Sequence, residues 1–241
     1  MKIRFFLLLF IWVSISYSQT KWDFPVKLGS TKWKSLKSAQ EIWKVQQIPT
    51  EILNKMSTED VFYAWLELPG RLEVLAYNTM QKGFDVTVNR FNVLSELLKR
   101  EDVGKVVFEY YQHFEPINLK LKKTSEEKGK FITDIGFVEF LLSQASVIRS
   151  LPISQVNSLL KKIAKDFDTK IGFIGKEKDP FWVETVLVLA GRLLNMRNSE
   201  HLKVRMAKNE LLVKSLNDGE IYSKDVYHDL VSCVLETAKS K

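Results

Sequence analysis

Apolar residues recur at helical spacing over most of the chain beyond residue 35. One stripe runs in steps of three and four through Phe84, Val88, Phe91, Leu94 and Leu98. Residues 103–114, 156–167 and 222–234 repeat this spacing. A stripe of this kind is typical of an amphipathic helix that packs on one face. The pattern predicts an all-α protein, an irregular array of about ten packed amphipathic helices arranged as helix pairs, an α-solenoid-like stack or a bundle.

Residues that start and end helices stand where this pattern needs them. Ser57 precedes Asp60 by three residues, as in a capping box, and Ser199 and Ser223 precede the last two helical stretches. Gly219 is placed to end the helix between them, because glycine readily adopts the left-handed conformation that closes many helices. These signals favour short helices joined by short turns.

One segment of the second half is apolar on almost every side. Between residues 181 and 194 the only interruptions are Glu184, Thr185, Gly191 and Arg192. A helix without a polar face has to be surrounded by other helices, so we expect this segment at the centre of the C-terminal half. Asp179-Pro180 supplies a typical start for it.

The stretch Gly172-Phe-Ile-Gly175-Lys176 superficially suggests a phosphate-binding loop. Its spacing is too short for that motif, and Glu177 stands where a magnesium-binding hydroxyl is needed. A carboxylate there would repel phosphate. We therefore interpret the stretch as a loop between two helices.

The N-terminus has the features of a secretory signal peptide. Lys2 and Arg4 precede a short apolar run at residues 5–13, and the small residues Ser16 and Ser18 follow it. The alternative, a retained membrane anchor, needs roughly 20 apolar residues, and this run is too short. We expect cleavage after Ser18, no lipoprotein processing because no cysteine follows, no transmembrane segment in the mature chain, and a periplasmic or secreted destination.

The remaining chain divides by composition. Residues 19–34 form an N-terminal arm in which tryptophan and phenylalanine alternate with lysines, and we expect the arm to pack on the body of the protein rather than to bind sugars or anionic polymers. Residues 35–115 and 131–241 form two helical halves. The polar, lysine-rich segment 116–130 connects them.

The mature chain is basic, and the surplus lies in its second half. Loss of residues 1–18 lowers the formal charge from +7 to +5. The connector carries Lys120, Lys122, Lys123, Lys128 and Lys130. An exported chain rarely meets nucleic acid, so we expect none as a partner. These lysines are candidate contacts to an anionic surface, and a solvated connector is the alternative.

Signatures of common active sites are missing from the sequence. The three histidines, His113, His201 and His228, are far apart and lack paired metal-ligand spacing, and no Gly-x-Ser-x-Gly elbow occurs. The single cysteine, Cys233, cannot form an intrachain disulfide and stands among apolar neighbours, which indicates a buried thiol. We expect no catalytic residues, no metal and no cofactor.

One polar constellation lies in and around the helical stretch at residues 84–98. On a continuous helix Asn92, Glu96 and Arg100 share one face, with Glu96 placed favourably for an ion pair to Arg100, and Asn78 and Gln81 could reach the same region. We interpret these five residues as a structural network between helices. The alternative is a polar pocket that receives a ligand carboxylate or amide at Arg100 and Asn92.

The same region carries a resemblance to known proteins over about residues 40–115. The matching pattern is Ile48-Pro49-x-x-Ile52-Leu53-x-x-Met56-Ser57-Thr58, then Pro69, Asn78, Gln81-x-Gly83-Phe84, Phe91-Asn92, Glu96-Leu97, Arg100 and Asp102. It resembles an uncharacterised family of exported bacterial all-helical proteins. The resemblance implies a signal peptide followed by packed helix pairs, and it implies no activity.

Three hypotheses of function follow from these observations. The first is a non-catalytic protein of the bacterial cell envelope, whose helices form a scaffold that binds another protein or a peptide. The second is a hydrolase that acts on an envelope polymer through a carboxylate pair such as Glu96 and Asp102. The third is adhesion to an anionic surface through the connector lysines, which would weaken as salt rises.

Overall fold

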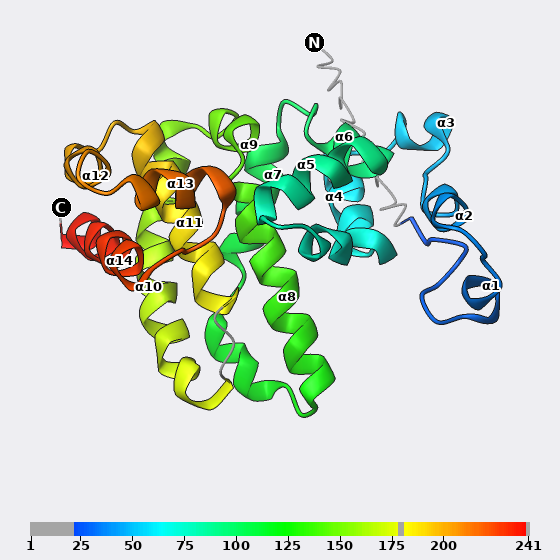
Figure 1. Cartoon of the computed structure of the whole chain (residues 1–241). Helices are drawn as coiled ribbons and strands as arrows, with labels where there is room; N and C mark the ends of the chain where they lie inside the picture. The colour runs from blue at the N-terminus through cyan, green and yellow to red at the C-terminus, as the bar shows by residue number, and fades with distance from the viewer. Residues whose placement is uncertain (1–21, 178–180, 240–241) are drawn as a thin grey trace, which may run out of the picture.

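The protein is all-helical (Figure 1). A computed structural model describes residues 22–177 and 181–239, and in these ranges the chain forms fourteen α-helices and two 3-10 helices with no strand. The all-α prediction is confirmed, with more and shorter helices than expected. The predicted signal peptide, residues 1–18, lies outside the described residues. No helix within the described ranges combines the length and the apolar content that crossing a membrane requires.

The first half of the chain forms seven short α-helices and one 3-10 helix. Their bounds are α1 Thr31–Lys34, α2 Ala39–Lys44, α3 Thr50–Leu53, α4 Thr58–Leu66, η1 Pro69–Ala76, α5 Met80–Arg90, α6 Asn92–Leu97 and α7 Val103–Gln112. The N-terminal arm packs on this half through Phe24 and Val26, which are buried, and Phe24 belongs to the hydrophobic core.

The predicted continuous helix over residues 84–98 is wrong, because it breaks at Phe91. Phe91 has an extended backbone between α5 and α6. The side-chain amide of Gln47 bridges the break: its Nε2 donates to Arg90 O at 3.0 Å, and the Asn92 N–H donates to its Oε1 at 3.1 Å. A side chain 45 residues away in the sequence thus satisfies the backbone groups that the break exposes.

The second half contains the longer helices. Their bounds are η2 Pro116–Leu121, α8 Ser125–Leu142, α9 Ala145–Arg149, α10 Ile153–Glu177, α11 Phe181–Met196, α12 Glu200–Met206, α13 Glu210–Asp218 and α14 Lys224–Lys239. Much of the lysine-rich segment 116–130 is itself helical, since it comprises η2 and the first turns of α8. Thr124 and Glu127 form a capping box at the start of α8.

Helix α11 lies at the centre of this half, as its apolar sequence predicts. It packs against α8, α10, α12, α13 and α14. Its residues from Val183 to Leu194 are buried apart from Glu184 and Arg192, which are partly buried. In Figure 1 the other long helices surround it.

The predicted loop at residues 172–176 is wrong, because α10 continues through it to Glu177. The two glycines interrupt the side-chain pattern without ending the helix. A Cβ added at Gly172 would meet no atom within 4 Å, so this glycine stands on an open face.

Several predicted helix ends are confirmed. The Asp60 N–H donates to Ser57 Oγ at 3.1 Å, the Val226 N–H donates to Ser223 Oγ at 3.2 Å, and Gly219 closes α13 with a φ of 75°. Ser199 precedes α12 without a side-chain capping bond. The start predicted at Asp179-Pro180 lies outside the described residues.

Buried apolar residues of both halves form one continuous core, which runs from Phe24 in the arm to Val234 in α14. Cys233 is part of this core, as predicted, and burial raises the pKa of its thiol.

Helices α5 and η1 pack so closely that their backbones are in contact. A Cβ at Gly83 in α5 would lie 2.0 Å from the carbonyl oxygen of Val74 in η1.

We predict opposite effects for two glycine substitutions. Gly83→Ala should destabilise the protein by about 1–3 kcal/mol, because η1 has to move away from α5. Gly129→Ala in α8 should stabilise it by about 0.5–1 kcal/mol, because a Cβ there meets nothing within 4 Å and alanine favours a helix. Thermal unfolding of the two variants checks both signs, and equal melting temperatures would show that the α5–η1 contact is not tight.

Candidate functional site

The residues of the predicted polar constellation contact two different parts of the fold. Asn92 Nδ2 donates to Ile48 O at 2.7 Å, and the Ile48 N–H donates to Asn92 Oδ1 at 3.1 Å. Arg100 Nη2 donates to Leu53 O at 3.2 Å, and its Nε lies 2.9 Å from Glu96 Oε1. These three side chains hold the segment 48–53 against α6.

The other two residues of the constellation lie elsewhere. Gln81 Nε2 contacts Asp85 Oδ1 at 2.8 Å and Gln144 Oε1 at 3.0 Å, so Gln81 joins α5 to the turn after α8. Asn78 is exposed in the turn before α5. Asp102, the second member of the carboxylate pair, accepts a hydrogen bond from the Thr58 hydroxyl at 2.5 Å.

The connector lysines do not gather into one free patch. Lys120 Nζ lies 5.8 Å from the ring centroid of Phe173, and Lys122 Nζ lies 5.3 Å from that of Phe131. Lys130 forms an ion pair with Asp134 at 2.7 Å. Lys123 and Lys128 flank the capping box at the start of α8. A role of the five lysines at an anionic surface stays a prediction.

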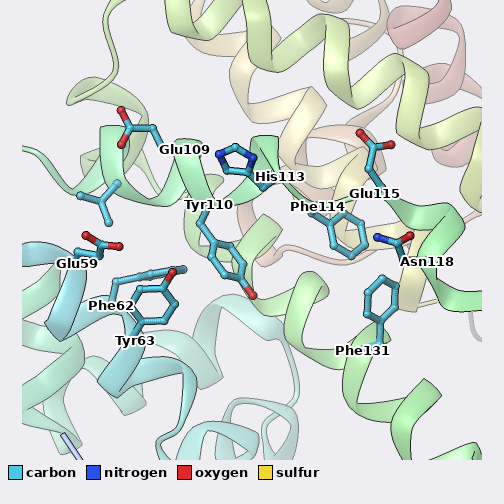
Figure 2. A pocket seen from close by; sticks show the side chains of 11 residues that line it. Glu59, Phe62, Tyr63, Glu109, Tyr110, His113, Phe114, Glu115, Asn118 and Phe131 are labelled. Atoms are coloured by element: carbon cyan, nitrogen blue, oxygen red, sulfur yellow. The ribbon is translucent and has the colours of Figure 1, made fainter. Parts of the chain in front are cut away.

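A cleft of about 490 Å³ opens between α4, α7, η2 and α8. We call it the aromatic cleft. Figure 2 shows the side chains that line it, which are Glu59, Phe62, Tyr63, Val106, Glu109, Tyr110, His113, Phe114, Glu115, Asn118 and Phe131. The volume is in the range of small-ligand and peptide sites, and the mixture of rings with a few polar groups is typical of them.

Aromatic rings form two groups in the cleft. At one end Tyr110 packs edge-on against Phe62 and Tyr63, with ring centroids 5.1 and 6.1 Å apart. At the other end Phe114 and Phe131 lie 5.0 Å apart. All but Phe62 keep part of their surface exposed. Burial raises the pKa of the Tyr63 and Tyr110 hydroxyls, which therefore stay protonated at neutral pH.

Carboxylates stand at both ends of the cleft. Figure 2 shows Glu59 and Glu109 beside the tyrosines, and Glu115 beside Asn118. No lysine or arginine is among the lining residues. Nearby lysines reach two of the carboxylates from outside: Lys105 lies 3.9 Å from Glu109, and Lys165 lies 3.3 Å from Glu115. Because both pairs are solvent-exposed, they contribute little stability.

A fully buried carboxylate lies behind the cleft. Glu139 of α8 accepts hydrogen bonds from the Tyr111 hydroxyl at 2.9 Å, from Lys170 Nζ at 2.5 Å and from the Thr185 hydroxyl at 2.7 Å. These donors come from α7, α10 and α11. Burial lowers the pKa of the Lys170 ammonium, and the charge of Glu139 opposes that shift.

A second ion pair connects this buried cluster to the cleft wall. Lys162 Nζ lies 3.0 Å from Asp166 Oδ2 and donates to Phe114 O at 2.6 Å. Burial raises the pKa of the Asp166 carboxyl, and Lys162 opposes that shift. The ring of Tyr111 stacks on that of Phe114 at 6.2 Å. The buried charges therefore position one aromatic wall of the cleft.

The sequence carries a signal for the buried cluster in the spacing of its charged residues. Lys162, Asp166 and Lys170 follow one another at intervals of four, and Glu139 interrupts the apolar run of residues 135–142. The sequence has no such signal for the aromatic cleft, because its rings come from three helices and a turn.

Among the described residues, no three histidine, cysteine or acidic side chains gather as a metal site.

Comparisons of the chain with protein-family models, with curated proteins and with solved structures found no match. The resemblance over residues 40–115 stays a prediction.

We predict that Arg100→Ala destabilises the protein by about 1–3 kcal/mol, because Leu53 O loses its donor and Glu96 its partner. The melting temperature should fall by about 2–4 °C for each kcal/mol. Lys99→Ala, at the exposed neighbouring position, is the control. An unchanged or higher melting temperature for Arg100→Ala would instead favour a ligand role for Arg100.

We predict that Lys170→Met lowers the free energy of unfolding more than Arg100→Ala does. The substitution leaves Glu139 buried without a cation, which costs about 3–5 kcal/mol. The double variant Lys170→Met/Glu139→Gln should lose less stability than Lys170→Met alone, because it buries no unpaired charge. Lys165→Met, at an exposed position of the same helix, should change stability by less than about 1 kcal/mol. Urea unfolding measures all three, and a double variant less stable than the single one would contradict the assignment.

Proposed function

We propose that the protein is an exported, non-catalytic binding scaffold that holds a basic peptide segment of a partner protein in the aromatic cleft. The observation that carries this proposal is the lining itself, in which partly exposed rings alternate with three carboxylates and no lysine or arginine. Export rests on the signal-peptide pattern at residues 1–18.

The cleft suits a chain that alternates cationic and apolar side chains. Ring faces attract cations, and this attraction grows when the cation loses part of its water. Phe131 already has the ammonium of Lys122 at 5.3 Å from its ring centroid, so such a contact occurs in this fold. Carboxylates at both ends supply the opposite charge, and the exposed lysines beside them are weak competitors.

The catalytic alternative has less support from the geometry. Glu96 is paired with Arg100, Asp102 accepts the Thr58 hydroxyl, and neither residue lines the aromatic cleft. A hydrolase needs two carboxylates that face one substrate across a fixed gap. Glu96 and Asp102 instead make structural contacts with neighbouring segments.

Titration with a fluorescent, end-capped nonapeptide in which lysine alternates with leucine tests the proposal. We expect binding to the purified mature protein, and about a tenfold weaker affinity for the double variant Glu59→Gln/Glu109→Gln, because two charge-assisted contacts are lost. The matched control is Glu101→Gln/Glu210→Gln, which removes the same charge at exposed positions outside the cleft.

A second peptide separates this mode of binding from hydrophobic adhesion. When glutamate replaces lysine in the probe, we expect no binding, since the carboxylates of the cleft would repel it. Equal affinity for both peptides, or equal loss in the cleft variant and its control, would refute the proposal.

A further inference from the structure

A second cavity, of about 440 Å³, lies on another part of the surface and differs from the aromatic cleft in charge. It opens between α5, the turn after α8, α9, the end of α11 and the end of α13. Its lining consists of two arginines, four side-chain amides, a serine and an apolar wall, namely Arg149, Arg192, Gln81, Gln144, Asn195, Asn217, Ser143, Ala145, Ile148, Met196 and Leu216. The lining contains no carboxylate, so the cavity carries the charge of two cations.

Arg192 donates to three neutral acceptors at this cavity. Its Nε donates to Leu216 O at 2.7 Å, its Nη1 to Ser143 Oγ at 3.1 Å and its Nη2 to Asn217 O at 3.1 Å. The guanidinium caps the end of α13 and lies 5.3 Å from the ring centroid of Phe140. Three of its five N–H groups are used, and two remain for a ligand.

The charge of Arg192 has no close carboxylate partner among the side chains that the structure describes. Asp85 and Asp218 act on it from beyond ion-pair distance. Asp85 is exposed and contacts Gln81, while Asp218 pairs with Lys214 and accepts from the Tyr222 hydroxyl at 2.6 Å. Burial lowers the pKa of Arg192 to about 10, so the guanidinium stays charged at neutral pH.

A half-buried cation without a counter-ion is unfavourable, and an anion in the cavity would relieve that cost. Arg149 stands in the same lining with its side chain exposed, and it forms no ion pair with any described residue. Two guanidinium groups bind a carboxylate well, because their planar N–H forks match its two oxygens.

We propose that this cavity binds a small organic carboxylate of about the size of an acylated amino acid. Arg192 and Arg149 hold the carboxylate, the amides of Gln81, Asn195 and Asn217 pair with the polar groups beside it, and Ile148, Met196 and Leu216 cover its apolar part. The alternative interpretation of the sequence had a ligand carboxylate at Arg100, which instead pairs with Glu96 and Leu53 O, and the proposed anion site lies at Arg192. This site does not depend on the aromatic cleft.

Calorimetric titration of the mature protein with N-acetyl-leucine and with N-acetyl-leucinamide tests the assignment. The two probes differ only in the carboxylate. We expect the acid to bind at about millimolar affinity or tighter, and the amide at least about tenfold more weakly, since it cannot form the charge-assisted bonds. Equal affinity for acid and amide, or no binding of the acid, would overturn the proposal.

Two exposed arginines provide a matched pair of variants. Arg149→Gln should weaken binding of the acid by about fivefold or more, while Arg197→Gln, one residue beyond the end of α11 and outside the lining, should leave it unchanged. Both positions are exposed, so both variants should fold. Equal effects of the two substitutions would show only general charge attraction and would refute the site.

Inorganic phosphate is the last probe. If phosphate displaces N-acetyl-leucine and binds more tightly than it, the ligand class is wrong and the cavity is a phosphate site. The basic peptide used for the aromatic cleft should not compete with N-acetyl-leucine, so each of the two proposals can be refuted without the other.

Discussion

The burial of Glu139 is the constraint on which the packing of the second half depends. A carboxylate without exposed surface needs a donor at each oxygen, and here the donors come from Tyr111, Lys170 and Thr185 on three different helices. Apolar contacts tolerate small rotations of a helix, whereas bonds of 2.5–2.9 Å do not. We infer that the pairing of Glu139 sets the mutual rotation of α7, α8, α10 and α11, in addition to the apolar burial that drives them together.

This constraint reaches the surface through α7. Tyr111 directs its hydroxyl inward to Glu139, so its neighbour Tyr110 lies on the outward face, in the aromatic cleft. Phe114, three residues after Tyr111, stacks on the Tyr111 ring, and its carbonyl accepts from Lys162. Both aromatic groups of the cleft are thereby attached to a part of the molecule that cannot shift without breaking a buried ion pair. A site whose rings are positioned in advance loses little entropy when it binds.

The sequence predicted the features that depend on local pattern. Helical class, the capping residues Ser57, Ser223 and Gly219, and the central place of residues 181–194 follow from periodicity and from terminal residues, which act within one or two turns. The sequence pattern gave wrong helix bounds where contacts with residues far away in the chain determine where a helix ends. The break at Phe91 depends on Gln47, and α10 continues through Gly172, where the next residue, Phe173, is buried in the core. The aromatic cleft and the Arg192 cavity could not be predicted, because each combines residues from several helices.

Helix α8 carries residues that line both proposed sites, and it also carries the buried carboxylate of Glu139. Phe131 near its start lines the aromatic cleft, and Ser143 just after its end lines the Arg192 cavity. Twelve residues of α-helix separate these positions by about 18 Å along the axis. Glu139 lies between them and ties the helix to α7, α10 and α11. Because the hydrogen bonds of Glu139 fix α8 near its C-terminal end, the proposed cationic and anionic ligands would be held at a constant separation. Opposite charge at the two ends also favours one orientation for any partner that carries both.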